Sequence, residues 1–376
     1  MRPEDIGDFV ALAGSSGKLL ASGAASAANC ALMKLAVLNP GGNDPEQTFP
    51  DFAGAPDENT HAPVNYHAFA ACTGGGFYRK ASAIPAEVRA VVLLLRHNLK
   101  PARGAVVELR QAKKVVAIAW KEAGAQQVAA QLSDPGKLRL FREICERCDG
   151  AIATTPDLVP LFHALGVPRS EFIPTPYPFD DARWDRSIPE EERRGIFVGT
   201  REFRVPARQH LVALLLIQRI AAGMGEPVTV FNLDGWRGRR MLDALRYPEG
   251  MLRVIEGRVP YPTYLRVMSK HRLVFQLDAS AVPGQVAGDA LLCRIPCIGG
   301  NGAIERIAFP DLCGHGRTHE QLFDFAARLL EHPHDCAALV TAALERAQPR
   351  LSFEAGKRAL ENFFAPSLRG IPSASS

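Results

Sequence analysis

A basic loop follows one of the apolar runs of the chain and carries residues suited to binding an anion. The candidate residues of this loop are Gly199, Thr200, Arg201, Arg204 and Arg208. Guanidinium groups bind phosphate oxygens through paired N–H donors, and the backbone N–H groups of a helix start, predicted here near residue 206, add further donors. The pattern predicts a diphosphate site, with a solvated basic face as the alternative.

A second set of candidate ligands lies in the stretch "GQVAGDALLCRIPCIGG", residues 284–300. Gly284 and Gly288 allow a ligand to approach the backbone, and Gln285 lies between them at the start of a predicted helix. Asp289 lies near the same helix end, where a carboxylate can accept two hydrogen bonds from a vicinal diol such as a ribose. We therefore expect Gly284, Gln285, Gly288 and Asp289 to bind a nucleotide.

The first half of the chain offers candidates for a second substrate. Gly41 and Gly42 occur in a long loop after the first apolar run, and Lys121 and Glu122 follow a later run as an adjacent base and acid. An acid and base at a strand end can perform proton transfer or hold an acceptor. A plain turn at the two glycines and an exposed helix start at Lys121 and Glu122 are the alternatives.

Metal ligands do not occur at a recognisable spacing. Cys145 and Cys148 fall on a predicted amphipathic helix, and Cys313, His315 and His319 lack a fourth ligand at a zinc-type spacing. We therefore expect no metal and no bound cofactor.

The elements that must position these residues alternate between short apolar runs and longer helical patterns. In the first half the predicted strands are residues 34–39, 90–95, 115–120, 151–154 and 171–174. In the second half they are residues 195–200, 228–233, 252–257, 273–278 and 295–300. Helical patterns are expected at residues 101–113, 137–148, 155–166, 206–223, 262–271 and 286–293 and through the C-terminal part.

Continuously apolar runs that alternate with helices are typical of parallel sheets covered on both faces. A segment rich in proline and charge, residues 175–195, separates the two series of runs. The fold class expected is therefore α/β, with two doubly wound Rossmann-like domains facing a cleft and helices at the C-terminus. Ligands of such sheets bind at the carboxyl ends of the strands, where the candidate residues lie.

The expected domain organisation has five parts. They are a loose extension (residues 1–32), an N-terminal acceptor domain (33–180), a linker (181–194), a C-terminal donor domain (195–350) and a C-terminal helix and tail (351–376).

Composition limits the classes of partner. A net charge of +4 over 376 residues is too weak to favour nucleic acid, but it suits anionic small molecules. No run of about 18 or more apolar residues occurs, so we expect no membrane span. Eight cysteines are ordinary for a reducing compartment. These features favour a cytoplasmic protein, with peripheral attachment at the inner membrane face as an option.

The segment around Asp289 resembles a known family. "DALLCRIPCIG" is similar to the "EAMACGxPVI" segment of the group 1 (family 4-like) glycosyl transferases, with Asp289 at the second conserved Glu, Ala290 at the Ala and Pro296 at the Pro. The stretches "FVGTREF", "VIEGRVPYPTYLRVMSKHRLVFQL" and "CDGAIATTPDLVPLF" resemble other family segments in the same order, over about residues 33–345. The resemblance implies a GT-B architecture and a nucleotide-sugar donor.

The chain departs from the family pattern at several positions. Ala281 stands eight positions before Asp289, where the family has a first Glu, and Asp278 and Gln285 are the nearby polar alternatives. Arg294 replaces a Gly, and no catalytic-type His follows the third or fourth strand. The donor sugar and the stereochemistry therefore do not follow from the resemblance.

The expected function is metal-independent transfer of a sugar from a nucleotide-diphosphate sugar, the co-substrate, to a glycan, lipid-linked sugar or small-molecule acceptor. Arg201, with Lys121 and Glu122, forms the expected catalytic set. Two alternatives remain open: a non-catalytic nucleotide-binding or scaffold protein that keeps the GT-B fold, and a nucleotide-sugar epimerase. A dehydrogenase is disfavoured because the first strand is not followed by GxGxxG.

Overall fold

The computed structural model of the protein describes residues 33–369, except positions 55–56, 58 and 122–123. Residues from Met33 onward form one compact unit. The predicted extension of residues 1–32 and the predicted catalytic Glu122 lie outside the described residues.

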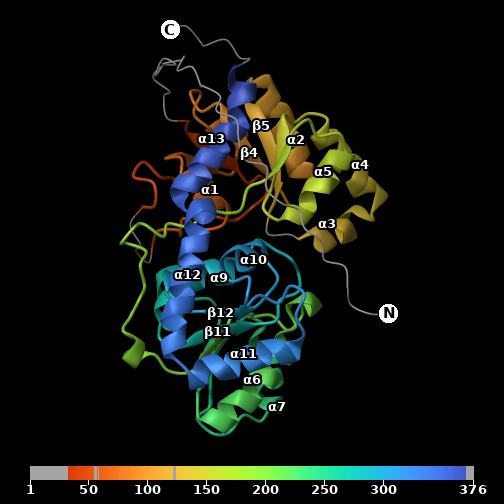
Figure 1. The fold of residues 1–376 in the computed structure, drawn as a ribbon. Helices are drawn as coiled ribbons and strands as arrows, with labels where there is room; N and C mark the ends of the chain where they lie inside the picture. The colour runs from red at the N-terminus through yellow and green to blue at the C-terminus, as the bar shows by residue number, and fades with distance from the viewer. Residues whose placement is uncertain (1–32, 55–56, 58, 122–123, 370–376) are drawn as a thin grey trace, which may run out of the picture. The chain divides into compact units, whose positions relative to one another are not determined.

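The first half of the described chain forms a seven-stranded sheet (Figure 1). Its strands are β1 (Leu35–Leu38), β2 (Gln47–Thr48), β3 (Gly76–Tyr78), β4 (Ala90–Leu95), β5 (Val115–Trp120), β6 (Gly150–Ala153) and β7 (Ser170–Phe172). Their order is β2-β3-β1-β4-β5-β6-β7, and only β2 pairs antiparallel. The strand order reverses between β1 and β4, so the loops after these strands flank a crevice.

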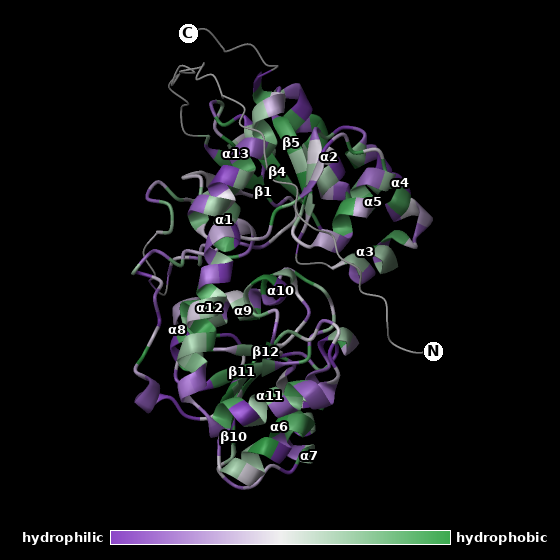
Figure 2. Cartoon of the chain, in the orientation of Figure 1, coloured by the Kyte–Doolittle hydropathy of each residue, from purple (hydrophilic) through white to green (hydrophobic). Residues whose placement is uncertain are grey.

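Helices cover both faces of this sheet because successive strand residues point to opposite sides. The helices of this half are α1 (Tyr66–Ala71), α2 (Lys100–Gln111), α3 (Ala125–Leu132), α4 (Pro135–Cys145) and α5 (Val159–Ala164). Val91, Leu93 and Leu95 of β4 pack in one apolar cluster with residues of α2 to α5. Val92 and Leu94 pack in the opposite cluster with residues of α1 and of the C-terminal helix α13 (Phe353–Arg369). Figure 2 shows the hydrophobic strands β4 and β5 between helices of mixed colour.

The second half forms a parallel five-stranded sheet. Its strands are β8 (Ile196–Val198), β9 (Val228–Asn232), β10 (Leu252–Glu256), β11 (Leu273–Gln276) and β12 (Cys297–Gly299). The order β10-β9-β8-β11-β12 is the order 3-2-1-4-5 of a Rossmann fold. Its strand order reverses between β8 and β11, and the basic loop follows β8 while the glycine-rich stretch follows β11.

Seven helices of the described chain accompany this sheet, and an eighth returns to the first one. The seven are α6 (His210–Met224), α7 (Gly235–Ala244), α8 (Tyr261–Met268), α9 (Gln285–Leu292), α10 (Ala303–Ala308), α11 (His319–Glu331) and α12 (His334–Leu351). Helix α12 packs against α9 and α10, whereas α13 packs against α1 and β5. The C-terminus therefore supplies a helix to each half of the chain.

Two segments cross between the sheets side by side. The segment between β7 and β8 contains only a short 3₁₀ turn, η3 (Glu190–Glu192). Its Tyr177 N–H donates to the Leu351 carbonyl at 2.6 Å, and Tyr177 forms a parallel bridge with Ser352 between α12 and α13. The boundaries of the predicted linker, residues 181–194, remain a prediction.

The α/β fold class with two Rossmann-like sheets is confirmed, and each of the predicted apolar runs overlaps a strand of the structure. The structure adds β2, α1 and β3 in the region after Gly42 and α7 in the region after β9, where no element was predicted. Helix α1 carries no amphipathic pattern because all six of its residues are buried. Among the described residues, no helix combines the length and the apolar character needed to cross a membrane.

Phe363 of α13 provides a test of this arrangement. Its side chain is buried in the cluster on the first sheet, its ring faces Gly150, and the Arg169 guanidinium lies 5.1 Å from the ring centroid. We expect Phe363→Ala to lower the free energy of unfolding by about 3–5 kcal/mol because a buried aromatic side chain is lost. Urea denaturation of the full chain measures this change.

The matched control is Arg358→Ala on the same helix, where an exposed ion pair with Glu354 at 3.5 Å is removed. A change of less than about 1 kcal/mol is expected there. Equal midpoints for the two variants would contradict the packing of α13 on the first sheet.

Candidate functional site

A cavity of about 430 Å³ lies at the carboxyl end of the second sheet. Its walls come from the loops after β8, β10 and β11, and His61 and Asn65 of the first half complete it. This is the topological switch point of the sheet, between β8 and β11, where ligands of doubly wound folds bind. The structure thus brings the basic loop and the glycine-rich stretch into one site.

The basic wall of the cavity follows β8. Gly199, Thr200, Arg201 and Arg208 line it. The Arg201 guanidinium lies over the Tyr264 ring at 5.5 Å and forms no ion pair with another described residue. Arg208 is paired with Asp278, which holds its guanidinium against the wall. This wall can therefore offer two guanidinium groups to an anionic ligand.

Gly199 and Thr200 shape this wall. A side-chain Cβ at Gly199 would lie 2.5 Å from Cγ1 of Val286, so only glycine allows the β8 loop to approach the start of α9. The buried Thr200 hydroxyl lies 2.9 Å from Nδ1 of His210, which fixes the turn before α6. Arg204 differs from its neighbours: its side chain is 59% exposed, lies 3.9 Å from Asp234 and does not line the cavity.

The start of α9 forms the floor. Gly284 has φ +93°, a conformation that favours glycine, and it and Gln285 line the cavity. The Gln285 side chain accepts a hydrogen bond of 2.9 Å from Asn65 Nδ2, so it also joins the two halves of the chain. The N-terminal N–H groups of α9 lie at this edge, where a helix dipole favours negative charge.

Gly288 and Asp289 lie behind this floor and do not line the cavity. A Cβ at Gly288 would lie 2.2 Å from the Tyr177 ring, so the space left by this glycine admits that ring. Asp289 is buried, and its Oδ1 accepts hydrogen bonds from Tyr177 at 3.3 Å and Tyr261 at 2.5 Å. The nucleotide contacts of these two residues remain a prediction, one that requires the tyrosine hydroxyls to move.

Burial controls the ionisation of Asp289. Loss of hydration raises its pKa to about 7, while the hydrogen bond from Tyr261, the charge of Arg201 and the hydrogen bond from Tyr177 act in the opposite direction. Asp289 is therefore a carboxyl group that gains or loses its charge near neutral pH inside the fold.

Three carboxylates line the cavity, those of Glu202, Asp278 and Glu305, whereas Ala281 does not line it. Asp278 is paired with Arg208, and Glu305 of α10 accepts a hydrogen bond of 2.9 Å from Gln276. Burial also raises the pKa of Glu305 to about 7, and its Oε2 has no hydrogen-bond partner. No sequence pattern predicted Glu305 as a site residue, because it reaches the cavity from α10, the element after β12.

A second cavity, of about 400 Å³, adjoins the first on the side of the first sheet. The two share five wall residues, which are His61, Asn65, Val259, Tyr261 and Gln285. His61 and Asn65 were not predicted as site residues, since the loop before α1 shows no regular pattern. No histidine was found at the expected strand ends, but His61 places an imidazole at the wall of both cavities.

The predicted acceptor residues lie near this second cavity, but none of those described lines it directly. Lys121 is ion-paired with Asp44, which lines the cavity. Gly41 and Gly42 do not line it: Gly41 has φ +76°, and a Cβ at Gly42 would lie 2.1 Å from the Asn39 amide nitrogen. These glycines shape the turn after β1, and their contact with an acceptor remains a prediction.

Apolar and aromatic side chains also line the first cavity, and the Arg201 guanidinium lies over the ring of one of them, Tyr264. Phe231, Leu233, Val259, Tyr261 and Tyr264 line this part of the first cavity. A planar, weakly polar group fits such a wall, whereas an anionic group fits the arginine wall. The cavity therefore combines surfaces suited to the base and to the phosphates of a nucleotide.

No protein-family model matches the chain, and no curated protein matches its sequence. Solved structures match its fold. An α,α-trehalose 6-phosphate synthase from Burkholderia multivorans is 11% identical with a TM-score of 0.57, covering 77% of this chain and 74% of that chain. A structure from E. coli described as bound with UDP-2-fluoro glucose is 12% identical with a TM-score of 0.56, covering 75% and 73%.

A UDP-forming synthase of the same kind from Burkholderia xenovorans, in complex with glucose-6-phosphate, is 13% identical with a TM-score of 0.54, covering 74% and 72%. At such identities the likeness establishes the architecture. The fold is therefore the GT-B fold of two Rossmann-like sheets. The resemblance to the group 1 glycosyl transferases is supported at the level of this architecture and not for that particular group.

The raised pKa of Asp289 predicts a pH-dependent stability. Its pKa lies near 3.8 when solvated and about 7 in the fold, so the folded state holds the proton more tightly. The resulting stability is fully present below about pH 4 and is lost as the pH rises through about 7. The Asp289→Asn variant still accepts the tyrosine hydrogen bonds but cannot ionise. Between about pH 5 and pH 8 we expect its free energy of unfolding to fall by about 1–3 kcal/mol less than that of the natural chain.

Urea denaturation at both pH values measures the difference between the variant and the natural chain. Asp311→Asn serves as the control, because Asp311 is 69% exposed in its pair with Arg346. If the natural chain and Asp289→Asn lost the same stability over this range, the burial of an ionisable Asp289 would be wrong.

Proposed function

We propose that the protein is a glycosyltransferase that takes a nucleotide-diphosphate sugar as donor. The observation that carries this proposal is the cavity at the switch point of a GT-B fold, which is lined by Arg201, Arg208 and aromatic side chains. Its support from known proteins is the fold shared with UDP-forming α,α-trehalose-phosphate synthases.

In this proposal the donor diphosphate binds between the arginines and the start of α9. Sugar transfer breaks the bond between the sugar and the diphosphate, and negative charge then develops on the phosphate oxygens. Arg201, Arg208 and the N–H groups near Gly284 stabilise that charge without reorganising, which lowers the barrier. The paired Asp278 keeps Arg208 in position until the ligand arrives.

The acceptor, a glycan, lipid-linked sugar or small molecule, enters through the second cavity. Asp44 and His61 line that cavity, with Lys121 bound to Asp44, so polar groups are available for an acceptor hydroxyl. Because the two cavities share five wall residues, acceptor and donor sugar meet beside Asn65 and Gln285. Closing the two halves over both substrates excludes the water that would otherwise hydrolyse the donor.

Nucleotide binding provides the first test. We expect the uridine, guanosine or adenosine diphosphate that fits the aromatic wall to bind the full chain and raise its melting temperature. Arg201→Gln and Arg208→Gln each remove a charged hydrogen-bond donor, worth about 1.5–3 kcal/mol, so affinity should fall roughly tenfold or more. Isothermal titration calorimetry measures the dissociation constants.

Arg346→Gln is the matched control, since its guanidinium pairs with Asp311 on the surface and does not line the cavity. Binding of no nucleoside diphosphate would refute the proposal. Nucleotide binding without transfer or hydrolysis of any nucleotide sugar would favour the non-catalytic alternative, and interconversion of a donor without an acceptor would favour the epimerase.

We further propose that the protein can attach peripherally to an anionic membrane through α7. Trp236 on this helix is 65% exposed, and the guanidinium groups of Arg237 and Arg240 lie 5.3 and 5.9 Å from its ring. An exposed indole flanked by cations is suited to the interface of an anionic bilayer, which attracts Lys and Arg and accommodates Trp.

Flotation with vesicles tests this attachment. The full chain should float with phosphatidylglycerol vesicles and not with neutral phosphatidylcholine vesicles, and Trp236→Ala should reduce the bound fraction several-fold. Leu215→Ala on α6, which removes another exposed apolar side chain, is the control and should leave the bound fraction unchanged. Equal recovery with both vesicle types would rule out this mode of attachment.

A further inference from the structure

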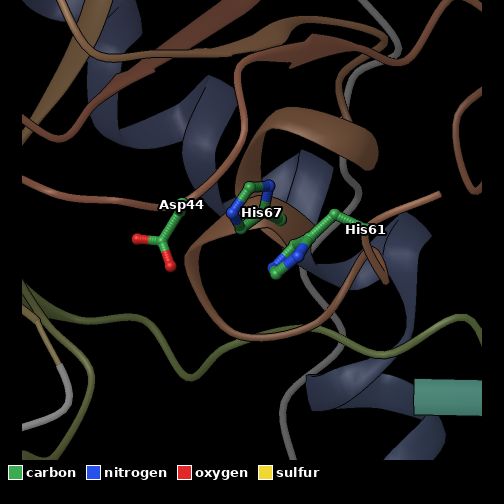
Figure 3. Close-up of side chains that lie close together, drawn as sticks. All are labelled: Asp44, His61 and His67. Carbon is green, nitrogen blue, oxygen red and sulfur yellow. The ribbon is translucent and has the colours of Figure 1, made fainter. Parts of the chain in front are cut away.

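Three potential metal ligands converge beside the second cavity. Asp44 comes from the loop after β1, His61 from the loop before α1, and His67 from α1 itself (Figure 3). One ligand atom from each side chain lies within 4.8 Å of the others. The fold thus brings together three residues whose spacing in the sequence matches no metal-binding motif.

His67 is held with one nitrogen unused. The side chain is 3% exposed, and its ring stacks on Phe77 with centroids 3.6 Å apart. Nδ1 lies 3.0 Å from the Gln47 amide, whereas Nε2 is buried without a hydrogen-bond partner. Buried polar atoms normally have partners, so an orphaned imidazole nitrogen indicates a ligand.

The Gln47 amide also suits a metal-bound histidine. The Gln47 amide nitrogen also donates to the His61 carbonyl at 3.3 Å. Exchanging its O and N would replace that bond with one in which the amide oxygen accepts the Nδ1 proton, and Nε2 of His67 would then be a lone-pair donor. A hydrogen bond on the second ring nitrogen is the usual arrangement for a metal-binding histidine.

The Asp44 carboxylate has one oxygen engaged in hydrogen bonds with described residues and one that is not. Asn39 Nδ2 donates to Oδ2 at 2.6 Å, and Lys121 Nζ donates to the same oxygen. Oδ1 accepts no hydrogen bond from another described residue. Asn39 and Lys121 therefore fix the carboxylate and leave Oδ1 for a further partner.

We propose that Asp44, His61 and His67 bind one divalent cation of the zinc type, with His67 contributing Nε2 and Asp44 contributing Oδ1. Two imidazoles and one carboxylate form a donor set that zinc prefers. Tetrahedral coordination needs the ligand atoms to close to roughly 3.3 Å from one another, a movement that the half-buried Asp44 and His61 side chains can make.

The fourth position of this site faces the second cavity, because Asp44 and His61 both line it. A zinc site with three protein ligands and one open position binds water or a substrate oxygen there. The site is separate from the arginines of the first cavity, so it does not depend on the proposed transferase function. If that function holds, the cation would bind an oxygen of the acceptor.

Lys121 distinguishes this site from an ordinary hydrogen-bonded cluster. Its ammonium group and a metal ion compete for the charge of the same Asp44 carboxylate. Removing the ammonium group should therefore strengthen metal binding, whereas it would only weaken a cluster held together by the ion pair. The direction in which zinc affinity changes when the Lys121 ammonium group is removed therefore distinguishes a metal site from a hydrogen-bonded cluster.

The experiment titrates the full chain, freed of metal with a chelator, with zinc chloride in a calorimeter. We expect one equivalent to bind, at least tenfold weaker binding in Asp44→Asn and His61→Gln, and tighter binding in Lys121→Met. His67→Gln should also lose binding, but Asp44 and His61 are less buried and so provide variants that fold readily. His163→Gln, an exposed histidine of α5, is the matched control and should bind as the natural chain does.

Cobalt(II) in place of zinc identifies the ligands. Nitrogen and oxygen ligands give visible bands without the near-ultraviolet thiolate band that a cysteine site would show. A thiolate band, binding unchanged in Asp44→Asn and His61→Gln, or no binding of zinc at micromolar concentrations would overturn the proposal. Nucleotide binding is measured separately, so failure here leaves the result for the proposed function distinguishable.

Discussion

Tyr177 connects the elements on which the site depends. Its backbone N–H bonds to Leu351, which joins the two segments that cross between the sheets, and its hydroxyl donates to the Gln285 carbonyl at 3.1 Å and to Asp289. The ring occupies the space left by Gly288. A single side chain thus ties the connection between the halves to the helix that forms the floor of the first cavity.

This contact has an electrostatic consequence. Tyr177 and Tyr261 are buried, and the neighbouring Asp289 carboxylate adds to burial in raising the pKa of both phenols, so they remain donors. Hydrogen bonds from two such donors offset part of the free-energy cost of burying the Asp289 carboxylate. The start of α9 is therefore held from behind by hydrogen bonds, while its other side remains available to a ligand.

The sequence predicted the parts of the fold that depend on local pattern. Continuously apolar runs such as 90–95 and 115–120 coincide with β4 and β5, because a strand buried on both faces needs apolar side chains at every position. The position of the first cavity was also predictable, since strand ends and glycine loops define it. Arg201, Arg208, Gly284 and Gln285 line it for this reason.

What the sequence could not predict depends on contacts between distant segments. Asp289 has the spacing of a ligand, yet it faces Tyr177, which lies more than a hundred positions earlier in the chain. His61 and Glu305 line the first cavity from a loop and a short helix whose patterns carry no signal. The packing of α13 on the first sheet could not be predicted from the sequence either, because an apolar stripe on a helix can pack on any sheet face.

The Asn65–Gln285 hydrogen bond shows how the two cavities act together. Asn65 has φ +53°, an unfavourable conformation for a residue other than glycine, and its amide donates across to the start of α9. Both residues line both cavities. A movement of the halves that lengthened this bond would displace the floor of the first cavity and the wall of the second in the same step. If the proposed function holds, this bond would couple occupation of one cavity to the shape of the other, as a reaction between two substrates held on different halves of the chain requires.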